Sequence, residues 1–324
     1  MGEFELLARI RERLPAGDPR IHLGSGDDAA VTVPEGATAT SVDALVEGVH
    51  FRRQHATFAQ IGHKALATAL SDLAAMGADP GESYVVLGLP PDLDEDDCIA
   101  LLDGILALAA ATGTSLVGGD VTRAEELFLA VTVVGHAAAP TSFVSRAGAK
   151  PGDALVLTGE IGGAAGGLAL LENPAFEPLL AAAPALRRRQ VEPRPRLGAG
   201  RALAHAGATA MIDLSDGLGG DARQLAESSG VALRIDAGAI PFAPGSKESM
   251  VATGRDPWEL LRGGEDYELL ASLPPGQAEA ATEAVRVAEG IALTKIGEVL
   301  AGSGVEIRLP GGRRAEPGGF DQLA

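Results

Sequence analysis

The chain has 324 residues and a formal net charge of −18, from 44 acidic and 26 basic side chains. Such an acidic surface repels nucleic acid and anionic membranes, and no basic stripe offsets it, so we expect neither as a partner. Hydrophobic residues make up 46% of the chain and aromatic residues only 3%, so aliphatic side chains must fill the core of one large or two medium domains.

The sequence also bounds the compartment. A lone cysteine, Cys98, excludes an intramolecular disulfide framework and a cysteine zinc site, and it agrees with a reducing cytoplasm. Residues 1–10 carry charges where a signal peptide is apolar, and no apolar run is long enough to span a membrane. We therefore expect a cytoplasmic protein.

The first 140 residues alternate between helix-like and strand-like patterns. Apolar residues at helical spacing predict helices, and short apolar runs bounded by glycine or proline predict strands. Helices are expected at residues 4–14, 58–77 and 94–111, and strands at residues 29–33, 38–42, 84–89, 114–117 and 127–135. The strand at 38–42 leads directly into Asp43, the strand at 114–117 ends at Gly118, and the run at 127–135 predicts a buried strand.

A glycine- and proline-punctuated stretch at residues 140–151 indicates a domain boundary. After it, strands are expected at residues 153–158, 208–214, 231–235, 267–273, 293–300 and 305–309, and helices at 164–171, 197–206, 218–228, 258–262 and 277–288. Residues 174–195 are expected to be irregular or weakly helical. The alternation predicts two α/β domains, residues 1–140 and 141–324, in which parallel pairing is permitted but not required.

Acidic residues repeatedly follow strand-like runs and adjoin glycines. Asp213 and Asp216 end one such run just before Gly217, where ligands bind in open α/β sheets. A helix cap is the ordinary alternative for a single turn of this kind. Similar acidic turns occur at Asp27-Asp28, Asp43, Asp72, Asp120 and Glu265-Asp266. The repetition predicts one polyacidic metal and phosphate site gathered from the whole chain.

Magnesium is the ion that suits these carboxylates. It takes one or two carboxylates together with substrate phosphates, and in phosphoryl transfer it neutralises the developing charge. Clustered carboxylates repel one another without cations, so several ions are expected. Arg146 can bind a phosphate through two hydrogen bonds, with a solvent-facing arginine as the alternative. The P-loop, HExxH and GxSxG motifs are absent, and residues 159–166 do not fit GxGxxG in phase.

Taken in order, the motifs resemble the thiamine-monophosphate kinase family. They are GDDAAV at 26–31, DALVEGVHF at 43–51, KAL at 64–66, SDLAAMGA at 71–78, GGD at 118–120, RAGAKPGD at 146–153, DLSDGL at 213–218 and GGEDYEL at 263–269. Each motif alone is weak, but the ordered set spans residues 3–320 and is highly specific.

The resemblance implies the two-domain α/β (α+β) fold shared with aminoimidazole ribonucleotide synthetase and selenophosphate synthetase. In that fold the sheet of the N-terminal domain pairs with the sheet of a second subunit, which implies a homodimer. A C-terminal α/β domain completes the ATP and substrate site. The implied reaction is direct in-line phosphoryl transfer from ATP to thiamine monophosphate, which yields thiamine diphosphate.

The resemblance also assigns roles to residues by motif position. Several magnesium ions would be held by Asp28, Ser41, Asp43, Asp72, Asp120, Asp213 and Asp216, with Asp72, Asp120 and Asp213 acting in catalysis through the metal. ATP would contact Gly119, Asp120, Arg146 and Ser215. The thiamine end would contact His50, Glu265 and Phe320, and Phe320 suits stacking on a flat heterocycle. The alternatives are a loop histidine at His50 and a hydrophobic anchor at Phe320.

One position departs from the family pattern. Many members have threonine before the aspartate at 43, whereas this chain has Val42, so a metal contact there must use the backbone carbonyl. Asp27 is left without a firm role and can support Asp28 indirectly.

Two other functions stay open at this point. A sibling ATP-dependent enzyme of the same fold would act on another phosphate or carboxylate substrate. A selenophosphate synthetase would need a reactive cysteine or selenocysteine near the N-terminus, and Cys98 is the only cysteine. A non-enzymatic protein that binds divalent metals would bind the ions but not the nucleotide.

Overall fold

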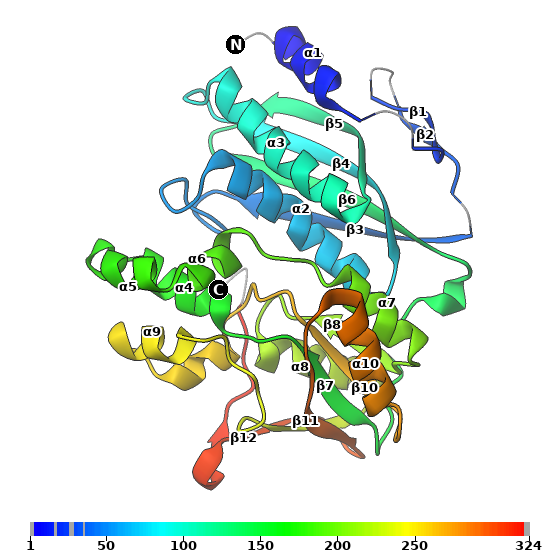
Figure 1. Cartoon of the computed structure of the whole chain (residues 1–324), viewed down its shortest axis with the longest axis vertical. Coiled ribbons are helices and arrows are strands. Elements are labelled where there is room, and N and C mark those ends of the chain that lie inside the picture. The colour runs from blue at the N-terminus through cyan, green and yellow to red at the C-terminus, as the bar shows by residue number, and fades with distance from the viewer. Residues whose placement is uncertain (1–2, 16–17, 26–28, 35, 321–324) are drawn as a thin grey trace. The chain divides into compact units, whose positions relative to one another are not determined.

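The computed structural model describes residues 3–15, 18–25, 29–34 and 36–320. The chain divides into two compact units, residues 1–73 with 78–140 and residues 74–77 with 141–324 (Figure 1). Each unit combines helices with a β-sheet, so the predicted α/β class is confirmed. Among the described residues, no helix has both the length and the apolar character that crossing a bilayer requires.

The first unit is built on a four-stranded sheet with the order β3-β6-β4-β5. Its strands are β3 (Ala37–Val46), β4 (Asp79–Leu89), β5 (Ser115–Arg123) and β6 (Phe128–Ala137), beside a small pair formed by β1 (Ile21–Leu23) and β2 (Val31–Thr32). The pair β4–β5 is parallel, and the other pairs of the sheet are antiparallel. Its helices are α1 (Glu3–Arg13), α2 (Phe58–Ala75) and α3 (Glu95–Thr112).

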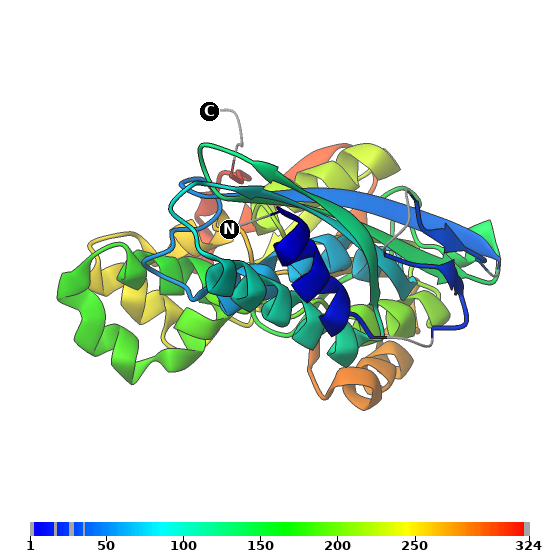
Figure 2. The ribbon, with the colours of Figure 1, turned by 90° about the horizontal axis from the view of Figure 1, so that it is seen from above.

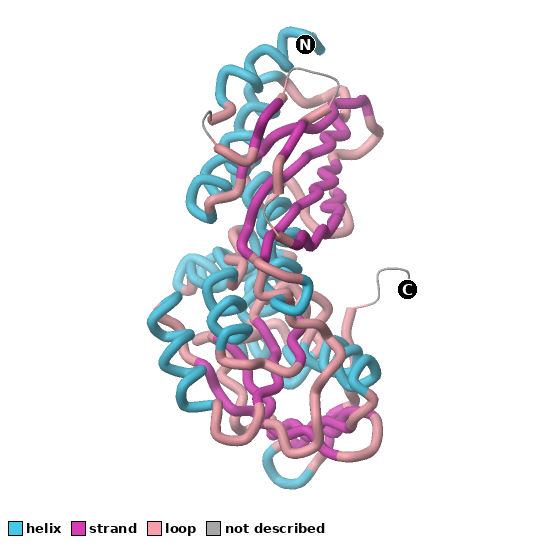
Figure 3. The backbone as a smooth tube through the Cα atoms, turned by 90° about the vertical axis from the view of Figure 1, so that its right-hand side faces the viewer, coloured by secondary structure: helices cyan, strands magenta, loops and turns pink. Residues whose placement is uncertain are grey.

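Helices α2 and α3 lie on one side of this sheet, as Figure 2 and Figure 3 show. Leu66 and Leu70 of α2 are fully buried. Gly62 and Gly104 allow the two helices to pack closely. A Cβ atom at either position would lie 1.9 Å from a carbonyl oxygen of the facing helix. A capping box at Asp94 starts α3. The apolar periodicity therefore identified these helices correctly.

The strand ends of the first unit differ from the prediction. β3 continues through Asp43 to Val46, and β5 continues through Gly118 and Asp120 to Arg123, so neither acidic motif is a turn. The long neighbours β6 and β4 supply hydrogen-bonding partners along both strands and extend them. β6 is not buried throughout, because fully buried and half-buried residues alternate along most of it.

The second unit contains a seven-stranded sheet with the order β13-β12-β9-β11-β7-β10-β8. Its strands are β7 (Ala154–Thr158), β8 (Ala210–Asp213), β9 (Ala232–Asp236), β10 (Leu269–Leu273), β11 (Leu293–Leu300), β12 (Gly304–Arg308) and β13 (Arg314–Ala315). Only β9 and β12 pair in parallel within the described sheet. The helical segments between strands therefore lead mainly to antiparallel neighbours.

The described part of the second unit also contains seven α-helices. They are α4 (Gly163–Leu171), α5 (Glu177–Ala182), α6 (Pro184–Val191), α7 (Leu197–His205), α8 (Leu218–Ser229), α9 (Ser246–Ala252) and α10 (Ala278–Glu289). Residues 174–195 thus contain two short helices where the sequence predicted irregular or weakly helical structure, because prolines in the first turns of α5 and α6 start helices rather than break them. α9 was not predicted, and residues 257–261 form a 3-10 helix.

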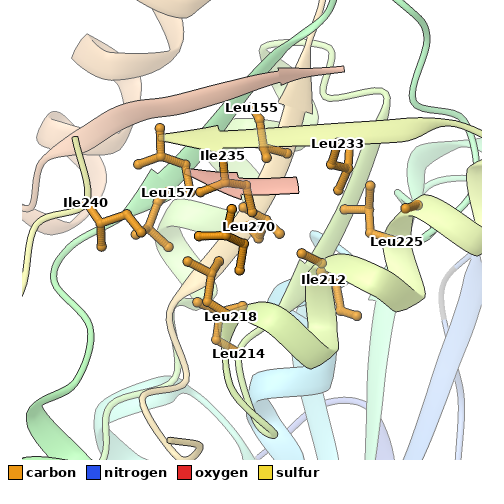
Figure 4. Close-up of a cluster of buried hydrophobic side chains, with 14 of the residues drawn as sticks. Leu155, Leu157, Ile212, Leu214, Leu218, Leu225, Leu233, Ile235, Ile240 and Leu270 are labelled. Carbon is orange, nitrogen blue, oxygen red and sulfur yellow. The ribbon is translucent and has the colours of Figure 1, made fainter. Parts of the chain in front are cut away.

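The core of the second unit lies between α8 and the sheet (Figure 4). Leu157 of β7, Ile212 of β8 and Leu270 of β10 pack there with Leu218 and Leu225 of α8. The alternate residues of β8 and β10 are buried as well, so these strands are covered on both faces. That burial fixes the end of β8, where the acidic motif begins.

Candidate functional site

In the first unit, Ser41, Asp43 and Asp72 form one polar group. Ser41 and Asp43 lie two residues apart on the same face of β3, and Asp72 lies near the end of α2. The Ser41 hydroxyl donates a hydrogen bond to the Asp72 carboxylate. Burial, and then the charge of Asp72, raise the pKa of Asp43 to about 6. Two carboxyl groups and a hydroxyl are therefore brought together where a cation would relieve the repulsion.

His50 is held at the turn that follows β3. Its Nδ1 accepts a hydrogen bond from the Val46 amide at 3.1 Å, and its carbonyl oxygen accepts one from the Lys64 ammonium at 3.1 Å. The Lys64 side chain is only 3% exposed. A buried lysine thus fixes the loop that carries His50.

Gly119 and Asp120 lie apart from this group in the first unit. β6 and β4 separate β5 from β3, and the pairing aligns Asp43 with Gly119 through Val131 and Val85. Aligned residues share a face, so Asp120 lies on the opposite face from Asp43. Asp27 and Asp28 lie outside the described residues.

In the second unit, Asp213 is the last residue of β8 and is 3% exposed. Ser215 and Asp216 form the turn that follows, and Gly217 adopts a φ of 110° immediately before α8. Glycine is needed there because side chains disfavour this backbone conformation. The predicted strand–turn–helix around the acidic motif is present, with the strand ending at Asp213 rather than Leu214.

The segment around Glu265 is bound to this turn by backbone hydrogen bonds. Glu265 and Tyr267 donate to the carbonyl oxygens of Ser215 and Leu214, both at 2.9 Å. Glu265 and Tyr267 have φ values of 68° and 50°, which non-glycine residues rarely adopt. A side chain on Gly264 would approach the Ser215 oxygen to 2.1 Å, so this close contact requires glycine. Strain of this kind is concentrated at functional sites.

The end of the described chain reaches the same turn. The Phe320 amide donates a hydrogen bond to the Asp216 carbonyl at 2.8 Å, and Gly319 packs against Gly220. The Phe320 side chain is 54% exposed, which leaves ring surface for a ligand and does not suit a buried anchor. The second unit therefore brings together Asp213, Ser215, Asp216, Glu265 and Phe320.

Arg146 lies in the loop before β7 and contacts the later turns of α8. Its guanidinium donates to the Gln224 side chain at 3.4 Å, and its carbonyl accepts a hydrogen bond from Ser229 at 2.9 Å. The side chain is exposed, in agreement with either a phosphate partner or a solvent-facing arginine.

Asp221 is an acidic residue that the sequence reasoning assigned no role. It is 2% exposed and accepts hydrogen bonds from the amides of Asp216 at 3.2 Å and Gly217 at 3.0 Å. Burial, followed by the charges of Asp213 and Asp216, raises the pKa of Asp221 to about 8. Asp221 follows Gly217 by four residues and lies in the first turn of α8. This spacing is the sequence signal that could have identified the contact.

We expect Asp221→Asn to stabilise the metal-free protein increasingly as the pH rises from 4 to 8. In this window the native carboxyl retains a proton that the unfolded chain releases, so the stability of the wild type falls as the pH rises. Asparagine keeps the acceptor oxygen and removes the titration. Thermal unfolding across this range should show a widening gap in melting temperature, and a gap independent of pH would contradict the assignment.

Asp266 and Glu268 extend the acidic segment into the interior. Asp266 accepts hydrogen bonds from the amides of Gly162 at 2.6 Å and Ala164 at 3.2 Å at the start of α4, and burial raises its pKa to about 7. Glu268 is fully buried and accepts two hydrogen bonds from Arg196. These contacts give both residues structural roles beside Glu265.

The donor chemistry of both acidic groups suits magnesium. No three His, Cys, Asp or Glu side chains in the described ranges lie close enough together to hold a metal by themselves. Magnesium commonly binds through one or two carboxylates and takes its remaining oxygen ligands from water and substrate phosphates. Paired carboxyl groups with raised pKa values at Asp43 and Asp221 fit an ion that completes its coordination with a phosphate.

Comparison with known proteins assigns the chain to a family. Residues 26–137 match the N-terminal domain of AIR synthase related proteins, and residues 150–310 match the C-terminal domain. The thiamine-monophosphate kinase of Mycobacterium tuberculosis is 39% identical over 278 residues, which cover 84% of this chain and 80% of that protein.

Solved structures give the same result. The crystal structure of thiamine-monophosphate kinase from Stenotrophomonas maltophilia has a TM-score of 0.84 and 37% identity, covering 97% of this chain and 98% of that one. A complex of AaThiL with AMPPCP and TMP has a TM-score of 0.76 and 29% identity, covering 98% of this chain and 96% of that one. The aminoimidazole ribonucleotide synthetase-like fold predicted from the sequence is confirmed.

Proposed function

This chain belongs to the thiamine-monophosphate kinase family, and on that premise we propose that it transfers a phosphoryl group from ATP to thiamine monophosphate. The products are thiamine diphosphate and ADP. The observation that carries the proposal is the grouping of Asp213, Ser215, Asp216, Glu265 and Phe320 within one unit. These residues combine carboxylates for magnesium, a hydroxyl for ATP, and a carboxylate and an aromatic ring for the thiamine end.

Magnesium ions would be held in the first unit by Asp43 and Asp72, with Ser41, and by Asp28 and Asp120. In the second unit they would be held by Asp213 and Asp216. Bound there, the ions would neutralise phosphate charge during in-line transfer. The shared hydrogen bonding of Ser41, Asp43 and Asp72 and the raised pKa of Asp221 support these assignments.

Motif positions assign separate contacts to the two substrates. ATP would contact Gly119, Asp120, Arg146 and Ser215, and thiamine monophosphate would contact His50, Glu265 and Phe320. The exposed ring of Phe320 and the fixed loop of His50 support the second group. The AaThiL complex with AMPPCP and TMP supports the proposed substrate pair.

The test is a turnover assay with ATP and either thiamine monophosphate or free thiamine, first with magnesium and then with a chelator. We expect thiamine diphosphate from the monophosphate only, and no product once the metal is removed. Magnesium-independent turnover would contradict the metal assignment. Binding of ATP without turnover of either substrate would favour a sibling enzyme acting on another phosphate or carboxylate, and metal binding without ATP binding would favour a non-enzymatic role.

We further propose that the protein is a homodimer joined through the uncovered face of the first unit's sheet. Along β3, Thr38, Thr40, Val42 and Ala44 are exposed, and Val42 is 65% exposed. The β6 residues opposite Thr40, Val42 and Ala44 are half-buried, and α2 and α3 lie on the other side of the sheet (Figure 3). Such an apolar sheet face is more stable when a second sheet covers it.

We also propose that the protein is located in the cytoplasm, which agrees with a single buried cysteine.

Val42→Asp is expected to convert the dimer to a monomer, because it places a charge at the centre of this face. Analytical ultracentrifugation at matched concentrations measures the change. Val287→Asp is the control, since Val287 is 71% exposed on α10 of the second unit and should leave the mass unchanged. A Val42→Asp protein that remains dimeric would place the interface elsewhere.

A further inference from the structure

Gln190 contacts the predicted substrate carboxylate from a distant part of the chain. It lies in the last turn of α6, its side chain is buried, and its amide nitrogen donates to the Glu265 carboxylate at 2.6 Å. Seventy-five residues separate the two in the sequence. Neither the motifs nor the roles proposed above include Gln190.

The carboxamide oxygen of Gln190 lies in an unfavourable environment. Its carbonyl oxygen is buried and accepts no hydrogen bond from any described residue. A buried carbonyl without a donor destabilises the fold, whereas an apolar side chain of the same length would fill the space without that cost. Stability therefore does not account for a glutamine at this position, but the need for a donor to Glu265 does.

The surroundings make Gln190 a rigid anchor. The neighbouring Arg189 donates to the backbone oxygen of Glu160 at 2.9 Å and to its carboxylate at 2.7 Å. A side chain on Gly167 of α4 would approach the Leu186 oxygen of α6 to 2.3 Å, so the two helices are in close contact. The donor that reaches Glu265 is therefore attached to a fixed helix.

Glu265 is constrained from both ends. Its backbone has a φ of 68° and donates to Ser215, while its carboxylate accepts the hydrogen bond from Gln190. The strained backbone sets where the side chain starts, and Gln190 sets where the carboxylate points. Holding a binding group in one direction before the ligand arrives lowers the entropy lost on binding.

We infer that Gln190 is a positioning residue that orients Glu265 for recognition of the thiamine end of the substrate. The inference rests on the proposed function, in which Glu265 contacts thiamine monophosphate. Gln190 itself does not touch the reacting phosphates. Its effect should therefore appear in the KM for thiamine monophosphate and not in the KM for ATP.

The test compares steady-state kinetics and thermal unfolding of Gln190→Met with those of the wild type. Methionine keeps the length and removes both the donor and the unpartnered oxygen. We expect the KM for thiamine monophosphate to rise about tenfold, the effect of a hydrogen bond to a charged group. The kcat and the KM for ATP should change less than about twofold, and the melting temperature should stay equal or rise. Gln277→Met, at an exposed position before α10, is the control.

A double-mutant cycle separates positioning from a general structural role. In the Glu265→Ala background, Gln190→Met should leave the KM for thiamine monophosphate unchanged, because the residue to be oriented is missing. If the wild type is active and Gln190→Met leaves the KM for thiamine monophosphate unchanged, the inference about Gln190 is overturned but the proposed function is not. A lower melting temperature with equal changes in all kinetic constants would also overturn it. A wild type that does not phosphorylate thiamine monophosphate would overturn the proposed function, and this inference with it.

Discussion

Asp213→Asn is expected to lower the turnover number about a hundredfold or more while the fold is retained, as removal of one charge-stabilising group commonly does. Asp213 is buried at the end of β8, beside the carboxyl groups of Asp216 and Asp221. Asparagine has the same shape but lacks the negative charge that a magnesium ion needs. Its neutral amide also relieves the repulsion with Asp221, so the metal-free variant should unfold no more easily than the wild type.

The matched control is Asp236→Asn. Asp236 is the last residue of β9, just as Asp213 is the last residue of β8, and both strands belong to the same sheet. Its carboxylate accepts a hydrogen bond from the Gly238 amide at 2.9 Å, and asparagine preserves that contact. Turnover of this variant should equal that of the wild type. Wild-type turnover in Asp213→Asn, measured with saturating magnesium, would refute the metal assignment at this residue.

Arg196→Met is expected to lower the free energy of unfolding by about 3–5 kcal/mol, the usual cost of removing one partner of a buried ion pair. Glu268 is fully buried and accepts hydrogen bonds from Arg196 Nε at 2.9 Å and from the Thr158 hydroxyl at 2.8 Å. Burial by itself would lower the pKa of Arg196, but the charges and hydrogen bonds of Glu268 and Glu289 together outweigh it and raise that pKa. Removing the guanidinium leaves the buried Glu268 carboxylate with only the Arg189 guanidinium, 3.8 Å away, to balance its charge.

Urea unfolding monitored by circular dichroism measures this loss. Arg286→Met is the control, because Arg286 makes the same two-hydrogen-bond contact with Glu283 on the exposed face of α10. Water replaces the lost partner there, so little change is expected. Adding Glu268→Gln to Arg196→Met should recover part of the stability. Equal losses in the two single variants would mean that burial does not determine the strength of the pair.

The sequence predicted most helices and the strand–turn–helix around Asp213 because both depend on local patterns. Apolar spacing located α2 and α3, and the acidic residues before Gly217 placed the turn between β8 and α8. The turns assigned to Asp43 and Asp120 were wrong because strand length depends on the neighbouring strands, which a local pattern does not reveal.

Contacts between distant segments could not be predicted from the sequence either. The hydrogen bond between Gln190 and Glu265 joins α6 to a loop far along the chain, and no periodicity encodes it. The raised pKa of Asp221 arises from burial and from neighbouring carboxylates, which only the folded turn brings together. The roles of the individual site residues stay predictions until the variants are measured.

The attachment of residues 317–320 to the turn before α8 bears on how the protein should be purified. The Phe320 amide is hydrogen-bonded to the Asp216 carbonyl. A charged, flexible affinity tag placed shortly after Phe320 would therefore lie close to the proposed thiamine contact. Kinetic constants should be taken from protein that carries no tag there.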